Sequence, residues 1–280
     1  MREVVYSPES PIRHPGRFLA AMFRDVLAGR ELAWRLFVRD ISAAYRQSFL
    51  GYIWAILPPL ATTLTFSFLN SQNMINIGQT PVPYPAFVLI GSLLWQAFLE
   101  SLNCPMSALN GGRAMLTKIN FPREALIMAG LMNLLFNLGI RLVLLIPLFV
   151  IFHIPVTSSM LLFPLGLLAV IGLGLSIGLW LAPVGLLYSD VGRGIGLISG
   201  FWMLLTPVVY PPPASGFGAF LAKWNPASPV ILTARDWLIG QEPSMLPGFV
   251  LIAALSAVAF FFGWIILRLT LPMLVERMGG

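Results

Sequence analysis

The sequence contains six apolar segments that are long enough to cross a lipid bilayer as helices. They lie at about 52–70, 84–105, 124–151, 159–187, 195–211 and 246–270. A bilayer core is about 30 Å thick, and a helix needs roughly 20 apolar residues to span it. Apolar residues make up 58% of the 280 residues and charged residues 10%, and the mean hydropathy is +0.84. These values lie outside the soluble globular range and predict an all-α integral membrane protein with six transmembrane helices.

Lysine and arginine are distributed unevenly around these segments. Fourteen of the 17 lie before the first segment, in the 106–123 and 188–194 loops or near the C-terminal end. Lys223 and Arg235 lie on the opposite side, and Arg141 lies within a segment. Cytoplasmic loops of membrane proteins carry the excess of basic residues. We therefore expect both termini to be cytoplasmic, and we attribute the net charge of +6 to orientation in the membrane rather than to nucleic-acid binding.

The region before the first span has two parts. Residues 1–29 are interpreted as a cytoplasmic lead that ends in a short helix, and residues 30–51 as an amphipathic helix lying in the membrane interface. The apolar face of this helix carries Trp34, Val38, Ile41, Tyr45 and Phe49, and the polar face carries Arg35, Arg39, Ser42 and Arg46. A simple orientation anchor and a mechanical role fit this pattern equally well.

The amphipathic helix continues through Gly51 into the first span, where Pro58 and Pro59 are adjacent. Each proline removes a backbone donor and permits a kink. Gly51, Pro58 and Pro59 are therefore interpreted as a hinge. The alternative is an ordinary span, because proline is more frequent in membrane helices than in soluble ones.

Two connections between spans are predicted to be helical. In the inner loop "LNGGRAMLTKINFPREALI", residues 109–127, Gly111 and Gly112 end one helix, a short basic helix follows, and Pro122 and Glu124 suit the first turn of the next. The alternative is a simple basic loop. The outer region 212–245 is too polar and proline-rich to span, yet two apolar stretches predict two short re-entrant or interfacial helices. The six-helix domain then covers 52–270, and 271–280 form a cytoplasmic tail.

The sequence lacks the common motifs for catalysis, nucleotide binding and metal binding. No G-x-x-x-x-G-K-[ST] phosphate loop and no H-E-x-x-H or G-x-S-x-G motif occurs. His14 and His153 stand apart from carboxylate clusters and from other metal ligands. We therefore expect no catalytic residue, no metal site and no bound cofactor in this chain.

Four stretches carry a family resemblance: "RDISAAYRQSFLGYIWAILPP", "LTKINFPRE", "GLLYSDVGRGIGLI" and "TPVVYP…WNPASPVI". In this order they resemble the membrane subunit of type-2 ABC exporters that carry polysaccharides. The likeness is greatest to O-antigen exporter permeases (the Wzm-like group), followed by capsule and teichoic-acid permeases. It covers roughly residues 30–270, and the N-terminal lead is less typical of the family.

The resemblance implies a homodimer in the bacterial inner membrane that pairs with two copies of a separate ATPase subunit, which binds ATP and Mg. The substrate would be a glycan on undecaprenyl pyrophosphate, moved from the cytoplasmic to the periplasmic face. The alternative is a type-2 ABC permease for capsular polysaccharide, teichoic acid, or a small molecule or drug. A lipid-linked glycan transferase is a third hypothesis, and the absence of acidic catalytic clusters in the loops argues against it.

The same resemblance implies roles for particular residues. Residues 30–51 would be the gate helix, with Arg35, Arg39, Tyr45 and Arg46. Residues 109–123 would be a coupling helix, and the predicted ATPase contacts are Arg113, Met115, Lys118, Arg123 and Glu124. The short helices within 212–245 would line the periplasmic exit.

A glycan conduit would favour aromatic side chains, which combine rigid apolar area with, in Tyr and Trp, a polar group. The candidates are Tyr52, Trp54, Phe66, Phe68, Trp202 and Tyr210. Two ionisable residues, Glu100 and Arg141, lie within spans and are functional candidates. They lie about 8 Å and about 25 Å from the cytoplasmic ends of their spans, so we expect no direct pair. Arg141 would instead meet backbone carbonyls, a subunit interface or, as a sharper hypothesis, a lipid pyrophosphate.

Overall fold

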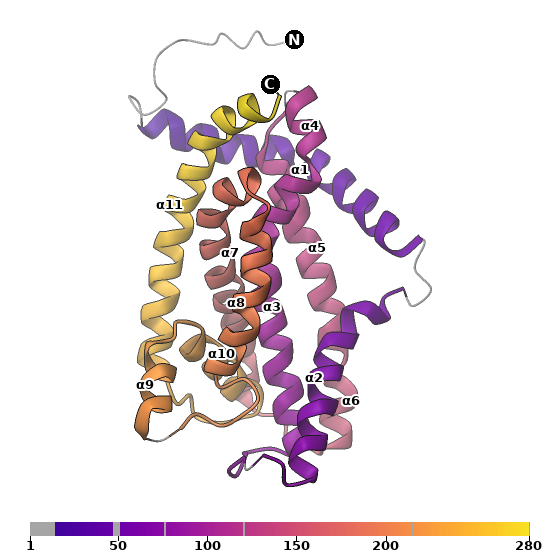
Figure 1. Ribbon diagram of the computed structural model, residues 1–280, viewed down its shortest axis with the longest axis vertical. Coiled ribbons are helices and arrows are strands. Elements are labelled where there is room, and N and C mark those ends of the chain that lie inside the picture. The colour runs from indigo at the N-terminus through magenta and orange to yellow at the C-terminus, as the bar shows by residue number, and fades with distance from the viewer. Residues whose placement is uncertain (1–14, 47–50, 76, 120, 214, 280) are drawn as a thin grey trace.

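The computed structural model describes residues 15–46, 51–75, 77–119, 121–213 and 215–279, and within these ranges it contains helices, turns and loops but no strand. The all-helical fold class is confirmed. Long helices lie side by side, and α1 crosses one end of them (Figure 1). The elements are α1 (Pro15–Arg46), α2 (Ile53–Ser71), α3 (Tyr84–Gly111), α4 (Arg113–Lys118), α5 (Glu124–Val143), α6 (Leu145–Ile151), η2 (Ser158–Leu162), α7 (Phe163–Leu187), α8 (Asp190–Leu205), α9 (Gly216–Trp224), α10 (Ala227–Leu238) and α11 (Leu246–Gly279).

Helix α3 forms the centre of the molecule. Eighteen of its 28 residues are buried, and its most extensive partner is α7. Gly174 and Gly178 of α7 permit this close packing. A Cβ atom at Gly174 would lie 2.6 Å from the carbonyl oxygen of Phe98, and one at Gly178 would lie 3.0 Å from Cδ of Pro105. Small residues at successive turns let two membrane helices approach closely.

Within the described residues, five helical segments are long and apolar enough to span a bilayer: Ile53–Ser71, Tyr84–Gly111, Glu124–Ile151, Ser158–Leu187 and Leu246–Arg277. They correspond to five of the six predicted segments. The span predicted at 195–211 is not confirmed, because α8 has only 16 residues. Such a helix rises about 24 Å, less than the bilayer core of about 30 Å. It stops before Thr206, which is extended because Pro207 disfavours helical geometry in the preceding residue.

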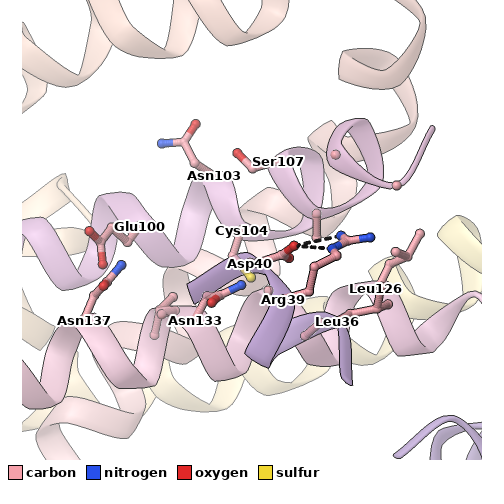
Figure 2. Close-up of a pocket in the computed structure, with 16 residues that line it drawn as sticks. Leu36, Arg39, Asp40, Glu100, Asn103, Cys104, Ser107, Leu126, Asn133 and Asn137 are labelled. Carbon is pink, nitrogen blue, oxygen red and sulfur yellow. Dashed lines mark hydrogen bonds and ion pairs between the residues drawn. The ribbon is translucent and has the colours of Figure 1, made fainter. Parts of the chain in front are cut away.

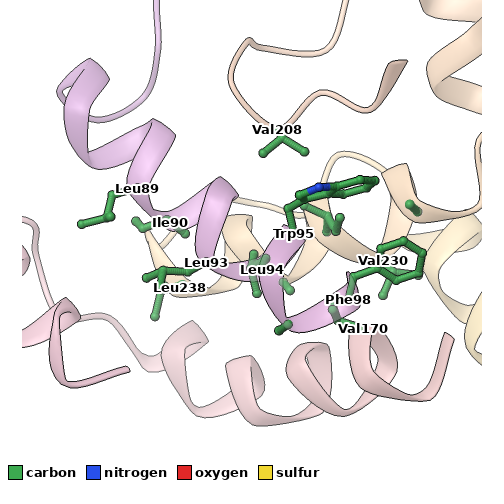
Figure 3. Packing of buried hydrophobic residues seen from close by; sticks show 14 of the residues in the cluster. Leu89, Ile90, Leu93, Leu94, Trp95, Phe98, Val170, Val208, Val230 and Leu238 are labelled. Atoms are coloured by element: carbon green, nitrogen blue, oxygen red, sulfur yellow. The ribbon is translucent and has the colours of Figure 1, made fainter. Parts of the chain in front are cut away.

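The predicted region 212–245 does contain two short helices, α9 and α10. All twelve residues of α10 are buried, and the helix packs on α3, α7 and α11. Figure 3 shows Val230 of α10 close to Phe98 of α3, and Leu238 of α10 close to Ile90 and Leu93 of α3. This enclosure by protein is the condition under which a short non-spanning helix is tolerated at membrane depth.

Helix α1 is continuous over 32 residues. The boundary predicted at residue 30, between a lead and an amphipathic helix, therefore falls inside one helix. Residues 1–14 of the lead, residues 47–50 of the amphipathic helix and Gly280 of the tail lie outside the described residues. The helix crosses the same end of the bundle at which α11 finishes (Figure 1).

Three faces can be distinguished on α1. The predicted apolar face is exposed and includes Trp34 and Val38, and the arginine face is also exposed. A third face was not predicted: Ala33 and Leu36 are buried where α1 packs on α5. Gly29 continues this buried face, and a Cβ atom there would lie 3.2 Å from Cβ of Ala125. The helix is therefore fixed to the protein along one side and presents apolar side chains on another.

The start of α2 has the features of the predicted hinge. Gly51 has a φ of +50°, in the left-handed region that glycine adopts readily. Pro58 and Pro59 lie inside α2, and neither can donate to the carbonyl four residues earlier. The carbonyl oxygen that Pro59 leaves without its helical partner belongs to Ala55.

Arg141 of α5 supplies the missing donor. Its Nε donates to the Ala55 carbonyl oxygen at 2.7 Å, and its Nη2 forms an ion pair with Oε1 of Glu100 on α3. The Arg141 side chain is only 4% exposed. A guanidinium with several donors in one plane suits this double task. We call the three groups, Ala55, Arg141 and Glu100, the arginine clasp.

The clasp corrects one expectation and meets another. A direct pair between Glu100 and Arg141 was not expected, and that prediction was wrong, whereas a backbone carbonyl was among the expected partners of Arg141. The reason is helix length: α3 continues to Gly111 rather than ending near residue 105. Glu100 therefore lies about 16 Å from that end, not about 8 Å, and the long arginine side chain covers the remaining difference in depth.

Replacing Arg141 with Met should lower the free energy of unfolding by about 3 kcal/mol, because the partly buried Glu100 carboxylate would remain without its counter-charge. Thermal unfolding of the purified protein in detergent measures this change. Arg193→Met is the matched control, because Arg193 pairs with Asp190 on the exposed surface, where a pair contributes at most about 1 kcal/mol. Adding Glu100→Gln to Arg141→Met should restore part of the loss. Equal stability of Arg141→Met and Arg193→Met would contradict the clasp.

Candidate functional site

The predicted coupling segment forms α4, a six-residue helix between α3 and α5. It lies at the end of the molecule that α1 crosses (Figure 1). Leu116 is buried and fixes the helix, while Arg113 and Lys118 are exposed. Met115 is partly buried, and its Sδ lies 3.8 Å from Nη1 of Arg39 on α1. The structure therefore brings the predicted gate and coupling helices into contact.

Arg123 and Glu124 have a different setting from the residues of α4. Arg123 is partly exposed. Glu124 accepts a hydrogen bond from Nη1 of Arg268 on α11 at 2.5 Å, and Nη2 of the same arginine donates to Asp25 of α1 at 2.5 Å. Glu124 is thus engaged within the chain, and Arg268 joins α1, α5 and α11. Sequence reasoning missed Asp25 and Arg268, because no local pattern relates residues so far apart.

Three of the four predicted gate-helix residues, Arg35, Arg39 and Arg46, lie on the exposed arginine face of α1. Arg35 pairs with Glu31 at 2.6 Å, and Arg39 pairs with Asp40 at 2.7 Å. Arg46 is exposed at the end of α1, and the side chain of Tyr45 lies outside the described residues. Exposed ion pairs of this kind contribute little to stability, so these arginines are available to interact with anionic groups.

A cleft of about 400 Å³ lies between α1, α3 and α5 and is lined by residues of all three helices. Figure 2 shows Asn133 and Asn137 of α5 pointing toward α3, which contributes Glu100 and Cys104. The wall on the α1 side includes the Arg39–Asp40 pair. Glu100 therefore belongs both to this cleft and to the arginine clasp. Sequence reasoning singled out Glu100 but not the asparagines, which alone carry no motif.

The predicted conduit aromatics do not form one lining surface within this chain. Trp54 and Phe68 of α2 are exposed, and Phe66 is partly buried against the core. Tyr52, just before α2, is also exposed and lies 5.9 Å from Phe136 between ring centroids. Trp202 packs on Phe98 at a ring-centroid distance of 5.1 Å, and its Nε1 donates to Asn225 at 2.9 Å. The hydroxyl of Tyr210 donates to the carbonyl oxygen of Leu204 at 2.7 Å. The structure therefore separates an exposed set on α2 from Trp202 and Tyr210, which make contacts within the chain.

A second buried arginine lies beyond α8. Arg235 of α10 donates to the carbonyl oxygens of Pro207 and Val208 at 3.2 and 3.4 Å and stands 3.9 Å from the ring centroid of Phe87. Burial lowers the pKa of the Arg235 guanidinium to about 10, and the Asp236 carboxylate opposes that shift, so Arg235 stays charged at neutral pH. It binds carbonyls where the chain leaves the α8 helix. Sequence analysis counted Arg235 only as an outer-side charge.

The described residues contain no cluster of three or more His, Cys, Asp or Glu side chains that could hold a metal ion. The groups that the structure does assemble are an exposed basic helix, an exposed arginine face and a polar cleft. All three lie at or near the end that α1 crosses (Figures 1 and 2). This set of groups suits docking of a partner and guidance of a polar solute.

Comparison with known proteins agrees with this reading. Residues 31–236 match the family model described as ABC-2 type transporter. The O-antigen export system permease protein RfbA of Myxococcus xanthus is 33% identical over 131 residues, which cover 44% of this chain and 48% of that protein. The protein of the same name from Klebsiella pneumoniae is 25% identical over 95 residues, or 34% of this chain and 35% of that protein.

The match therefore spans about half or less of the length of these curated relatives. It confirms the resemblance to O-antigen permeases that the sequence motifs indicated. The family model covers well over half of the chain and includes α2 through α9 and most of α10. The chain belongs to the ABC-2 type transporter family, as a membrane subunit.

Proposed function

We propose that this chain is the permease subunit of an ATP-driven exporter that moves a lipid-linked polysaccharide, O-antigen above all, across the bacterial inner membrane. The glycan would travel on undecaprenyl pyrophosphate from the cytoplasmic to the periplasmic face. The observation that carries the proposal is the 33% identity over 131 residues with an O-antigen export permease. The exposed arginine face of α1 supports it, because arginine suits anionic lipid headgroups and phosphates.

The functional unit in this proposal is a homodimer, and α8 supplies the supporting observation. None of its residues is buried, and Leu197 and Phe201 are 72% and 70% exposed. Gly196 and Gly200 have open space where a Cβ atom would stand. Small residues beside large apolar ones are typical of helix interfaces in membranes. We place the second copy against α8, where it would cover the exposed apolar side chains of this helix.

An ATPase subunit would dock at α4 in each half of the dimer and would hold the ATP and Mg. Arg113 and Lys118 are exposed there and suit an acidic rim, since charges at an interface rim steer association and fix register. Met115 of α4 contacts Arg39 of α1, so a displacement of α4 on docking would also displace α1. Glu124 does not belong to this surface in our proposal, because Arg268 engages it.

The glycan would pass along the side of α2 that carries the exposed rings of Trp54 and Phe68, whereas Tyr52, which precedes α2, lies 5.9 Å from Phe136 of α5. The Trp54 and Phe68 rings are exposed in a single chain and would face the space between two copies. Trp202 and Tyr210 would not line this path directly. They would support the residues that line its outer end. Arg141 does not serve as a pyrophosphate ligand here, because the clasp engages it.

The proposed orientation predicts that residue 118 faces the cytoplasm and residue 223 the periplasm, because the basic residues gather on the side of α4. Lys118→Cys and Lys223→Cys, each with Cys104→Ala, should be treated with a membrane-impermeant maleimide in cells whose outer membrane has been permeabilised. The cysteine at 223 should react and the cysteine at 118 should react only after lysis. The reverse labelling pattern would show that the protein has the opposite orientation in the membrane.

Deletion of the gene should remove the glycan from the cell surface and cause lipid-linked glycan to accumulate inside. Surface glycan by immunoblot and the lipid-linked pool by mass spectrometry measure the two effects, and the wild-type gene should reverse both. Normal surface glycan in the deletion strain would reject the proposal. Normal surface glycan with increased sensitivity to toxic compounds would favour a permease for small molecules.

The same deletion strain tests the coupling surface. Arg113→Glu combined with Lys118→Glu should fail to restore export and should recover less ATPase subunit on purification, because two rim contacts are reversed in sign. Arg17→Glu with Arg24→Glu, an equal charge change on exposed α1 positions away from α4, is the control. Full export and full ATPase recovery with the α4 variant would reject this surface.

A further inference from the structure

The cleft between α1, α3 and α5 is lined by three neutral amide side chains and by three charged ones. Asn103 comes from α3 and Asn133 and Asn137 from α5. A primary amide carries two donors and an acceptor, and Nδ2 of Asn103 already donates to the carbonyl oxygen of Leu99 at 2.8 Å. The volume of the cleft, about 400 Å³, lies within the range of sites that enclose small organic ligands. A cleft of this lining and size suits a molecule with many hydroxyl groups.

Glu100 and Asn133 each have polar atoms in the cleft without a hydrogen-bond partner among the described residues. Oε2 of Glu100 is buried and has no hydrogen-bond partner in the described structure, although Oε1 is paired with Arg141. No hydrogen bond of the Asn133 amide occurs among the described residues. Buried polar groups are nearly always hydrogen-bonded in proteins. A ligand hydroxyl could donate a hydrogen bond to Oε2 of Glu100. Another hydroxyl could pair with the Asn133 amide either as donor or as acceptor.

The charges in the cleft disfavour an anion. Among the described lining residues Arg39 is the one cation, and Asp40 already pairs with it. Glu100 adds a carboxylate, while its partner Arg141 is not part of the lining. With one cation and two carboxylates in the described lining, a phosphate or pyrophosphate would find no excess of positive charge to offset its desolvation in a partly buried site. A neutral polyhydroxyl ligand meets no such penalty.

We propose that this cleft is a binding site for one or two neutral sugar units of the transported glycan, with the lipid pyrophosphate held outside it. The proposal rests on the proposed export function and adds a recognition site to it. Because Leu36 and Arg39 of α1 form one wall, a shift of α1 would change the width of the cleft. Sugar binding and the position of α1 are then coupled.

The test uses the full chain with its ATPase subunit in lipid nanodiscs. Ser107 lines the cleft and is exposed, so Ser107→Cys with Cys104→Ala places a single reporter thiol there. The probe is the soluble glycan released by mild acid from the lipid-linked pool of the same cells. It should slow labelling by a small maleimide about threefold when two thirds of the sites are occupied. Inorganic pyrophosphate at the same concentration should leave the rate unchanged.

Variants localise the effect. Asn133→Leu with Asn137→Leu, in the reporter background, should abolish the slowing and keep the labelling rate without glycan. Asn70→Leu, at the far end of α2, is the matched control and should retain the slowing. If thermal unfolding shows that the double variant is not folded, Asn133→Leu alone takes its place.

Each outcome supports or overturns the site. No slowing by the glycan up to its solubility limit, or an undiminished slowing in the folded asparagine variant, would overturn it. Slowing by pyrophosphate alone would identify a headgroup site instead. A negative labelling result together with lost surface glycan in the deletion strain would reject the sugar site and leave the export function standing.

Discussion

The bend at the start of α2 depends on one buried arginine. Pro59 cannot donate to the Ala55 carbonyl, and Nε of Arg141 replaces that missing donor at 2.7 Å. Glu100 keeps the guanidinium charge compensated, and without it the desolvation of a buried cation would be unfavourable by several kcal/mol. The clasp therefore ties α2 to α5 and to α3, the most buried of the candidate spanning helices among the described residues. Thr62 and Thr63 add hydroxyl bonds to the carbonyls of Pro58 and Pro59, a pattern that often bends helices.

Helix α1 precedes α2 in the sequence and contacts three other helices of the molecule. It packs along α5, contacts α4 through Arg39 and Met115, and is joined to α11 by the Asp25–Arg268 pair. It leads directly toward Gly51 and α2. Motion imposed at α4 would therefore reach α2 through a helix of 32 residues, and the amide-lined cleft lies between the elements that would move.

Hydropathy and basic-residue counts were enough to predict the all-helical fold, five of the spans and the two short helices after α8, because burial in lipid depends on local composition. They placed the end of α8 too far along the chain, because the helix ends where Thr206 adopts an extended conformation before Pro207. The Glu100–Arg141 pair was missed because it depends on where α3 ends, and helix ends are poorly specified by sequence. The Arg268 network and the polar cleft arise from packing between distant segments, for which a single sequence has no local signal.

The central claim is that the proline bend of α2, fixed by the arginine clasp, is used in transport rather than merely tolerated. Pro58→Ala with Pro59→Ala restores two backbone donors, so the helix should straighten and the protein should remain at least as stable in detergent. Export should nevertheless fall, because α1 could no longer displace the first turns of α2 relative to the rest. Glycan export in the deletion strain and thermal stability should be measured on the same variant. Reduced export from a stably inserted protein supports the account, and full export from that protein contradicts it.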